Sequence, residues 1–254
     1  MYSFLHLRGL KNPNPIMNVN GALKQISDQF RGYVFCSDCE DLLNKNGEKW
    51  VQNNIPHSHD AVFPLLGAIG KLTPIHIEKD LRVFDVSTEK AFDMKQLVYF
   101  GMSIFWRGAV HQWMSSSKQR APLVSLGAYD VPIRKFLLGA GRFPKDVVLL
   151  LYIWSVGSLM MPGLFAPRPE ESPECPRYWF CVPGLIFRLL IGDNVSQEAR
   201  ALNATHGIVS LDNRVTFGVW GYAAKRVASL PSGPKIADML NEVATVLSEA
   251  SSKE

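Results

Sequence analysis

The chain has 254 residues, of which 47% are hydrophobic and 20% are charged, and its formal net charge is +4. This length and composition argue against a mainly disordered chain and allow a sizeable hydrophobic core. Residues 61–150 hold the positive excess, with twelve Lys or Arg against seven Asp or Glu. Such an excess would suit a face that contacts phosphates, but it is also typical of an ordinary soluble surface.

The first fifteen residues, MYSFLHLRGLKNPNP, lack the basic start and the long apolar run of a secretory signal. We therefore expect a cytoplasmic protein, whose cysteines are free thiols or metal ligands rather than disulfides. The uncharged stretch from Val147 to Pro167 approaches the length of a membrane helix. Gly157, Pro162 and Gly163 interrupt it. A buried strand followed by a turn is predicted instead, and no stable membrane insertion is expected.

The stretch RGYVFCSDCEDLLNKNGEKW, residues 31–50, combines a β-like run, a C-x-x-C pair and a helical pattern. The pair consists of Cys36 and Cys39. The apolar residues after it recur at spacings that share one helical face. These residues are Leu42, Leu43, Trp50 and Val51. The predicted order is strand, C-x-x-C, helix.

A C-x-x-C pair supplies two of the four protein ligands that a structural zinc site usually has. His57 and His59 follow the pair in sequence and are candidates for the other two. Cys175 and Cys181 would instead give four thiolates, although a buried free thiol is the simpler interpretation of Cys181. A partner chain is another source of ligands. The pair would also be compatible with a chain that holds only half of a site.

Residues 55–92 contain several prolines and one clear β-like run, LRVFDVS, and are predicted to be a connector with one or two strands. Asp93 followed by Gln96 is typical of a cap at the start of a helix. A broad apolar face follows, which predicts a central helix near residues 94–115.

A second helix is expected from about Val131. The chain then becomes rich in β-like runs, first VVLLLYIW and then RYWFCVPGLIFRLLIG, with a break at Pro183 and Gly184. The stretch NRVTFGVWGYA, from Asn213, would add another strand. An amphipathic terminal helix is expected near residues 234–250.

These patterns predict an α+β protein. Residues 1–60 would form an N-terminal segment like part of a treble clef, with a strand, the C-x-x-C pair and a helix. Residues 61–254 would form a body of helices and an antiparallel sheet, on which the N-terminal segment packs.

Four stretches together resemble a group of uncharacterised bacterial proteins that carry an HNH-like treble clef. They are GYVFCSDCEDLLNKNGEKWV, YFGMSIFWRGAVHQW, VSLGAYDVPIRKFLLG and RYWFCVPGLIFRLLIG. The resemblance implies that Cys36 and Cys39 are the rear pair of zinc ligands. It further matches Glu40, Trp50, Trp106 and Arg107 to the pattern of the group.

In the group, a front C-x-x-C and a Ser-His dipeptide come before the rear pair, and neither precedes Cys36 in this sequence. In an HNH nuclease the histidine activates water, while a divalent metal stabilises the leaving phosphate oxygen. Two expectations follow and stay open. Either the start is truncated, or the module has lost its zinc and serves as a scaffold.

Arg107 and His111 are the candidate catalytic residues, because they form the most concentrated polar feature on the predicted central helix. The resemblance implies an HNH-like protein that is associated with DNA or RNA and comes from a defence or mobile-element locus, in an active or a catalytically inactive form. If active, it would hydrolyse phosphodiesters with a metal ion. The alternative is a non-enzymatic binding module with a vestigial zinc pair, with a protein partner or a second copy as its ligand.

Overall fold

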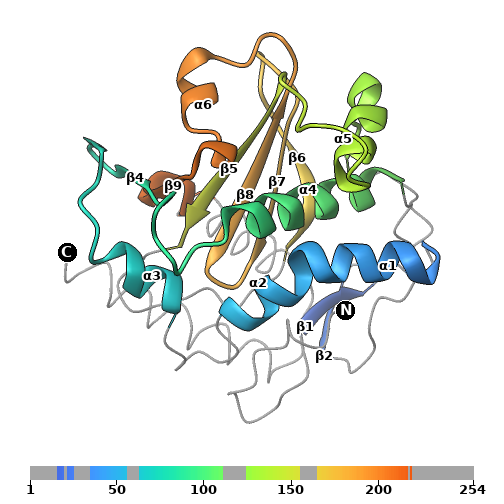
Figure 1. Cartoon of the computed structure of the whole chain (residues 1–254), viewed down its shortest axis with the longest axis horizontal. Coiled ribbons are helices and arrows are strands. Elements are labelled where there is room, and N and C mark those ends of the chain that lie inside the picture. Colours follow the sequence, from blue (N-terminus) through green and yellow to red (C-terminus); the bar gives the residue numbers. More distant parts are fainter. Residues whose placement is uncertain are drawn as a thin grey trace.

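The computed structural model describes residues 16–19, 22–25, 35–55, 63–110, 124–154, 165–216 and 218. It shows an α+β protein (Figure 1). The helices are α1 (Ser37–Leu43), the π-helix η2 (Asn44–Glu48), α2 (Lys49–Asn54), α3 (Pro64–Ile69), α4 (Met94–Val110), the 3₁₀-helix η3 (Gly127–Tyr129), α5 (Asp130–Leu137), α6 (Gln197–Ala201) and the 3₁₀-helix η4 (Ala204–His206). The strands are β1 (Ile16–Val19), β2 (Ala22–Gln25), β3 (His76–Glu78), β4 (Leu81–Asp85), β5 (Val147–Ile153), β6 (Phe165–Glu170), β7 (Arg177–Val182), β8 (Leu185–Ile191) and β9 (Ile208–Asp212).

The described strands form two sheets. Strands β1 and β2 make a small antiparallel pair, and the other seven form one sheet in the order β3-β4-β9-β5-β8-β7-β6. The sequence predicted an antiparallel sheet, and this is wrong at one place, because β5 and β9 run parallel through Tyr152 and Ser210. The chain leaves β5 for the antiparallel strands β6, β7 and β8 and returns to its other side only at β9.

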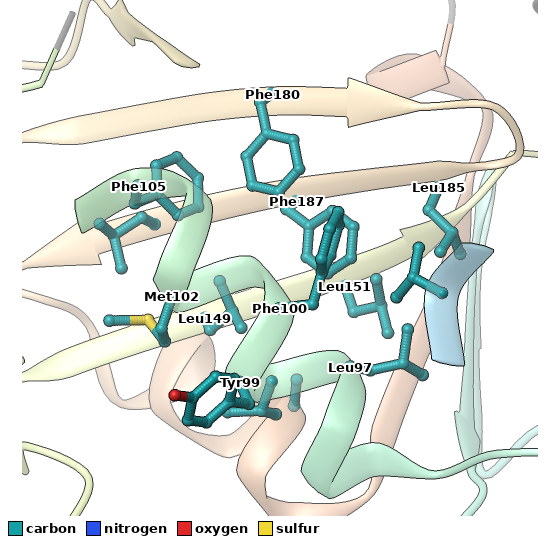
Figure 2. Close-up of a cluster of buried hydrophobic side chains, with 14 of the residues drawn as sticks. Leu97, Tyr99, Phe100, Met102, Phe105, Leu149, Leu151, Phe180, Leu185 and Phe187 are labelled. Carbon is teal, nitrogen blue, oxygen red and sulfur yellow. The ribbon is translucent and has the colours of Figure 1, made fainter. Parts of the chain in front are cut away.

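Helix α4 covers one face of the large sheet and forms the centre of the core (Figure 2). The predicted cap at its start is confirmed, since the backbone N–H of Gln96 donates to Oδ1 of Asp93 at 3.0 Å. Helix and sheet approach closely at Gly101, where a Cβ would lie 2.8 Å from Cδ1 of Phe187. The ring of Phe187 stacks on that of Phe180, with centroids 4.7 Å apart. A single aromatic layer therefore joins α4 to β7 and β8.

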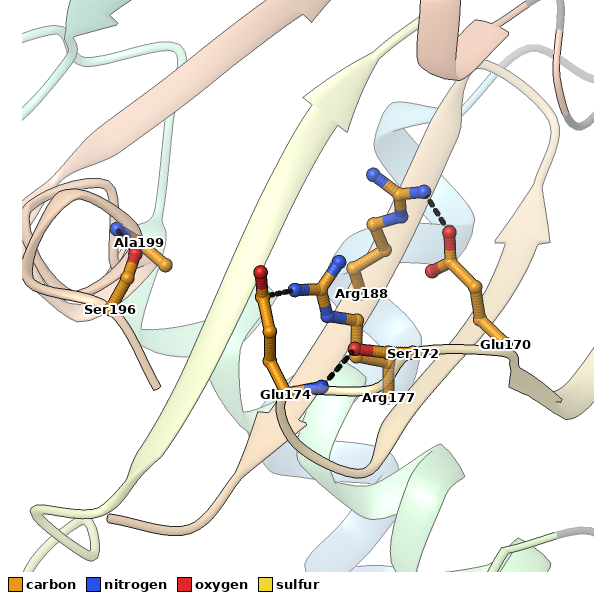
Figure 3. A network of polar contacts seen from close by, with 7 residues as sticks. All are labelled: Glu170, Ser172, Glu174, Arg177, Arg188, Ser196 and Ala199. Carbon is orange, nitrogen blue, oxygen red and sulfur yellow. Dashed lines mark hydrogen bonds and ion pairs between the residues drawn. The ribbon is translucent and has the colours of Figure 1, made fainter. Parts of the chain in front are cut away.

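The opposite face of the sheet has its own apolar cluster, with several charged side chains beside it. Arg188 of β8 pairs with Glu170 of β6, and Arg177 of β7 pairs with Glu174 in the preceding turn (Figure 3). The guanidinium of Arg168 lies 5.1 Å from the ring centroid of Trp179. These contacts fasten the β6–β7–β8 edge of the sheet.

The uncharged run from Val147 onward begins as the fully buried strand β5, as the sequence predicts. Among the described residues, no helix is both long enough and apolar enough to cross a membrane. The predicted turn between β7 and β8 is also confirmed, with Gly184 at φ +79°.

The strand predicted from Asn213 is wrong, because residues 213–216 are helical. The carboxylate of Asp212 accepts hydrogen bonds from the backbone N–H groups of Arg214 at 2.9 Å and Val215 at 3.3 Å. An acceptor at that position caps a helix and competes with continuation of β9. The terminal helix predicted near residues 234–250 lies outside the described residues.

Candidate functional site

Cys36 and Cys39 lie at the beginning of a helical run that extends from Ser37 to Asn54. Cys36 is the exposed N-cap residue, with extended backbone, and Cys39 is half-buried in the first turn. A helix begins here because the backbone N–H of Glu40 donates to the carbonyl of Cys36 at 3.0 Å. The two thiols therefore project from one turn, which is the arrangement that a C-x-x-C pair needs to bind one metal ion.

The two thiols differ in acidity because they interact with each other. The backbone N–H of Cys39 and then its thiol donate toward Cys36 and lower the pKa of Cys36. The same thiol–thiol hydrogen bond, together with partial burial, raises the pKa of Cys39. Cys36 is thus the thiol of the pair that ionises first, and its thiolate is accessible to a metal ion or an electrophile.

The helical run is held against α4 by a close backbone approach. Residues 44–48 form a π turn inside the run, and Gly47 of this turn faces Phe100 of α4. A Cβ at Gly47 would lie 2.8 Å from the backbone nitrogen of Phe100. Only a residue without a side chain allows this approach.

Arg107, one of the two candidate catalytic residues, lies in this interface. Its side chain is 3% exposed and forms an ion pair with Glu48 of the π turn. Nε of Arg107 also donates to the carbonyl of Ser103 at 3.3 Å, and Nη2 donates to Oγ of Ser103 at 3.2 Å. Arg107 therefore joins α4 to the helical run that carries the cysteines. The sequence singled out Arg107 but gave no indication of Glu48 as its partner.

Trp106, the neighbour of Arg107, connects the cysteine end of the run to α5. Its ring stacks on that of Phe35, the residue before Cys36, with centroids 5.3 Å apart and an interplanar angle of 16°. Its indole Nε1 donates to Oδ1 of Asp130, the first residue of α5, at 3.0 Å. The position of Cys36 is thus set by an aromatic contact with the central helix.

The other matched residues play local parts in the helical run. Trp50 is half-buried and packs at the edge of the core, and its carbonyl accepts from Nδ2 of Asn54 at 2.8 Å. Glu40 is half-buried in the first turn, next to Cys39.

The structure does not bring Cys175 and Cys181 to the C-x-x-C pair. Both are buried in the apolar cluster on the face of the sheet opposite to α4. Burial raises the pKa of Cys181 to about 12, so this thiol stays protonated. Within the described ranges no three His, Cys, Asp or Glu side chains gather as a metal site.

The three candidate histidines, His57, His59 and His111, lie outside the described residues. The described part of the site therefore consists of two thiols on a rigidly held helical run. No family model, no curated protein and no solved structure matches the chain.

Proposed function

We propose that this protein is a nucleic-acid-associated binding module of the HNH-like, treble-clef type, in which Cys36 and Cys39 bind zinc as thiolates. One observation carries this proposal: both thiols lie at the start of one helix, with Cys36 exposed as its N-cap residue and Cys39 half-buried in its first turn. In the second half of a treble clef, a strand leads into the C-x-x-C pair and a helix follows it. The antiparallel pair β1 and β2 precedes the cysteines in this chain.

The donor set fits zinc on chemical grounds but is only half of a structural site. Zinc prefers thiolate and imidazole ligands and usually takes four of them. The helical run separates Cys39 from Ile55 by roughly 20 Å. His57 follows Ile55 by two residues, which span at most about 7 Å. The remaining ligands are therefore more readily supplied from elsewhere in the chain or from a partner than by His57.

Binding rather than hydrolysis is proposed because of where Arg107 lies. Its guanidinium is engaged with Glu48 and Ser103 inside the protein. A group that stabilises charge on a substrate phosphate must be able to contact it. DNA or RNA is the partner that the resemblance implies, and a cytoplasmic location is compatible with such a partner.

The test is the zinc content of the purified full chain, measured by mass spectrometry. We expect about one zinc ion per chain, lost in Cys39→Ser and kept in Cys175→Ser, which removes a thiol on the other face of the sheet. The absence of zinc in the unaltered protein, or zinc that survives Cys39→Ser, would overturn the zinc part of the proposal. A gel-shift assay with DNA and RNA tests the nucleic-acid part separately.

A further inference from the structure

Four basic side chains are exposed on α5 and in the loop that follows it. They are Arg134, Lys135, Arg142 and Lys145, here called the α5 basic surface. Two of them lie in the last turn of the helix, and two lie in the segment that leads to β5. They fall within a short part of the chain, so their positive potentials add.

The end of α5 brings the two pairs of basic residues together. The helix stops at Gly139, whose φ of +71° turns the chain back. The backbone N–H of Ala140 then donates to the carbonyl of Lys135 at 2.8 Å. A Cβ at Gly141 would lie only 3.2 Å from Cβ of Lys135. Arg142 directly follows Gly141, so its backbone lies close to Lys135.

Two acidic residues of this region are engaged with other groups. Asp130 accepts a hydrogen bond from the indole of Trp106 at 3.0 Å. Asp146 lies 3.7 Å from Nη1 of Arg200, whose Nη1 also donates to the carbonyl of Lys145 at 2.8 Å. In the described part of the chain, the ion pairs involve none of the four basic side chains. All four side chains are exposed, so an external anion can reach them.

The exposed face of α5 also carries apolar groups. Val131 is 45% exposed and Leu138 is 50% exposed. With Arg134 and Lys135 they occupy positions i, i+3, i+4 and i+7, which share one face of a helix. The opposite face is buried through Ile133 and Leu137. An exposed face that mixes cations with a small apolar area suits a sugar–phosphate backbone, whereas a membrane surface requires a much larger apolar face.

We propose that the α5 basic surface binds the phosphate backbone of a nucleic acid. Because nucleic acid is the partner proposed above, this role of α5 rests on the proposed function. It assigns the contact to α5 and its following loop, on residues separate from the cysteine pair.

The experiment measures the affinity of the purified full chain for a labelled DNA duplex and for a labelled single-stranded RNA, by fluorescence anisotropy over a series of salt concentrations. Arg142→Gln/Lys145→Gln removes two charges outside the helix, so it leaves helix α5 intact. Arg134→Gln/Lys135→Gln removes the other two, and circular dichroism checks its folding. Lys71→Gln/Lys90→Gln is the matched control, because both lysines are exposed on other elements.

We expect each α5 variant to lose about tenfold in affinity and to reduce the slope of log affinity against log salt by about two. The control should change neither quantity. Equal losses in the control, or no loss in either α5 variant, would overturn the role of α5 while nucleic-acid binding stands. No binding of DNA or RNA by the unaltered chain would overturn both the role of α5 and the nucleic-acid part of the proposed function. Binding through α5 to anionic phosphatidylserine vesicles and not to nucleic acid would also overturn them.

Discussion

The carboxylate of Glu48 and the guanidinium of Arg107 form an ion pair inside the protein, with side-chain exposures of 7% and 3%. The two residues are 59 positions apart in the sequence and come from the π turn and from α4. Burying two charges is costly, and their mutual attraction compensates only when both are present. The pair therefore specifies how the cysteine-bearing helical run docks on the central helix.

Loss of both members of this pair should cost less stability than the two single losses added together. We expect Glu48→Leu and Arg107→Met each to lower the free energy of unfolding by about 3–5 kcal/mol, because each leaves an uncompensated buried charge. The double variant should lose clearly less than the sum. Urea unfolding of all four proteins completes the cycle. Additive losses would show that the two side chains do not stabilise each other.

The approach of the π turn to α4 predicts opposite effects at two helical glycines. Gly47→Ala should cost about 1–3 kcal/mol, since its Cβ would lie 2.8 Å from the backbone nitrogen of Phe100. Gly67 of α3 is exposed with nothing within 4 Å of its Cβ position. Gly67→Ala should therefore stabilise by about 0.5–1 kcal/mol. Thermal unfolding compares the two, and a gain in stability at Gly47 would contradict the described contact.

Alanine substitutions at two glycines with positive φ should distinguish the cost of backbone strain from the cost of a steric clash. A Cβ at Gly139 would have no neighbour within 4 Å. Backbone strain of about 1–2 kcal/mol is therefore the whole loss of stability expected for Gly139→Ala. At Gly184 the same strain applies, and a Cβ would also lie 2.6 Å from Cε1 of Phe63. Gly184→Ala should therefore cost measurably more in denaturant unfolding. Similar costs at both positions would show that Phe63 moves aside freely.

Alkylation rates should rank the thiols in protein freed of metal by a chelator. Iodoacetamide reacts with thiolates, so Cys36, with its lowered pKa, should react faster than Cys39, whose pKa is raised. Cys181, buried and with a pKa of about 12, should react last. As the pH falls, alkylation of Cys36 should slow at a lower pH than alkylation of free glutathione does, because the pKa of Cys36 is lowered. Peptide mass spectrometry measures the extent of alkylation at each cysteine. Faster alkylation of Cys39 than of Cys36 would contradict the proposed order of their pKa values.

The strongest sequence patterns predicted the parts of the fold that depend on local apolar periodicity. Helix α4 and strand β5 are long enough and apolar enough for their burial to decide their conformation. The cap formed by Asp93 and Gln96 is a hydrogen bond between residues three positions apart, so the local sequence was sufficient to predict it. The two cysteines were located by their spacing alone.

Features that depend on distant neighbours were not predictable in this way. The partner of Arg107 and the parallel contact between Tyr152 and Ser210 join residues that are far apart in sequence. The helical start after Asp212 replaced an expected strand because one side-chain acceptor outweighed β-like composition. The roles of Phe35 and Glu48 in holding the cysteine end also arise only from packing against α4.

The stacking of Phe35 on Trp106 and the docking of Gly47 on Phe100 have a practical consequence for dividing the chain. A fragment that begins after residue 60 would lose both contacts, together with the carboxylate that faces Arg107. The fragment would expose to water the face of α4 that carries Trp106 and Phe100, and Arg107 would lose its ion-pair partner. Residues 35–55 therefore belong to the same folding unit as α4, and domain boundaries for expression should be placed to keep them together.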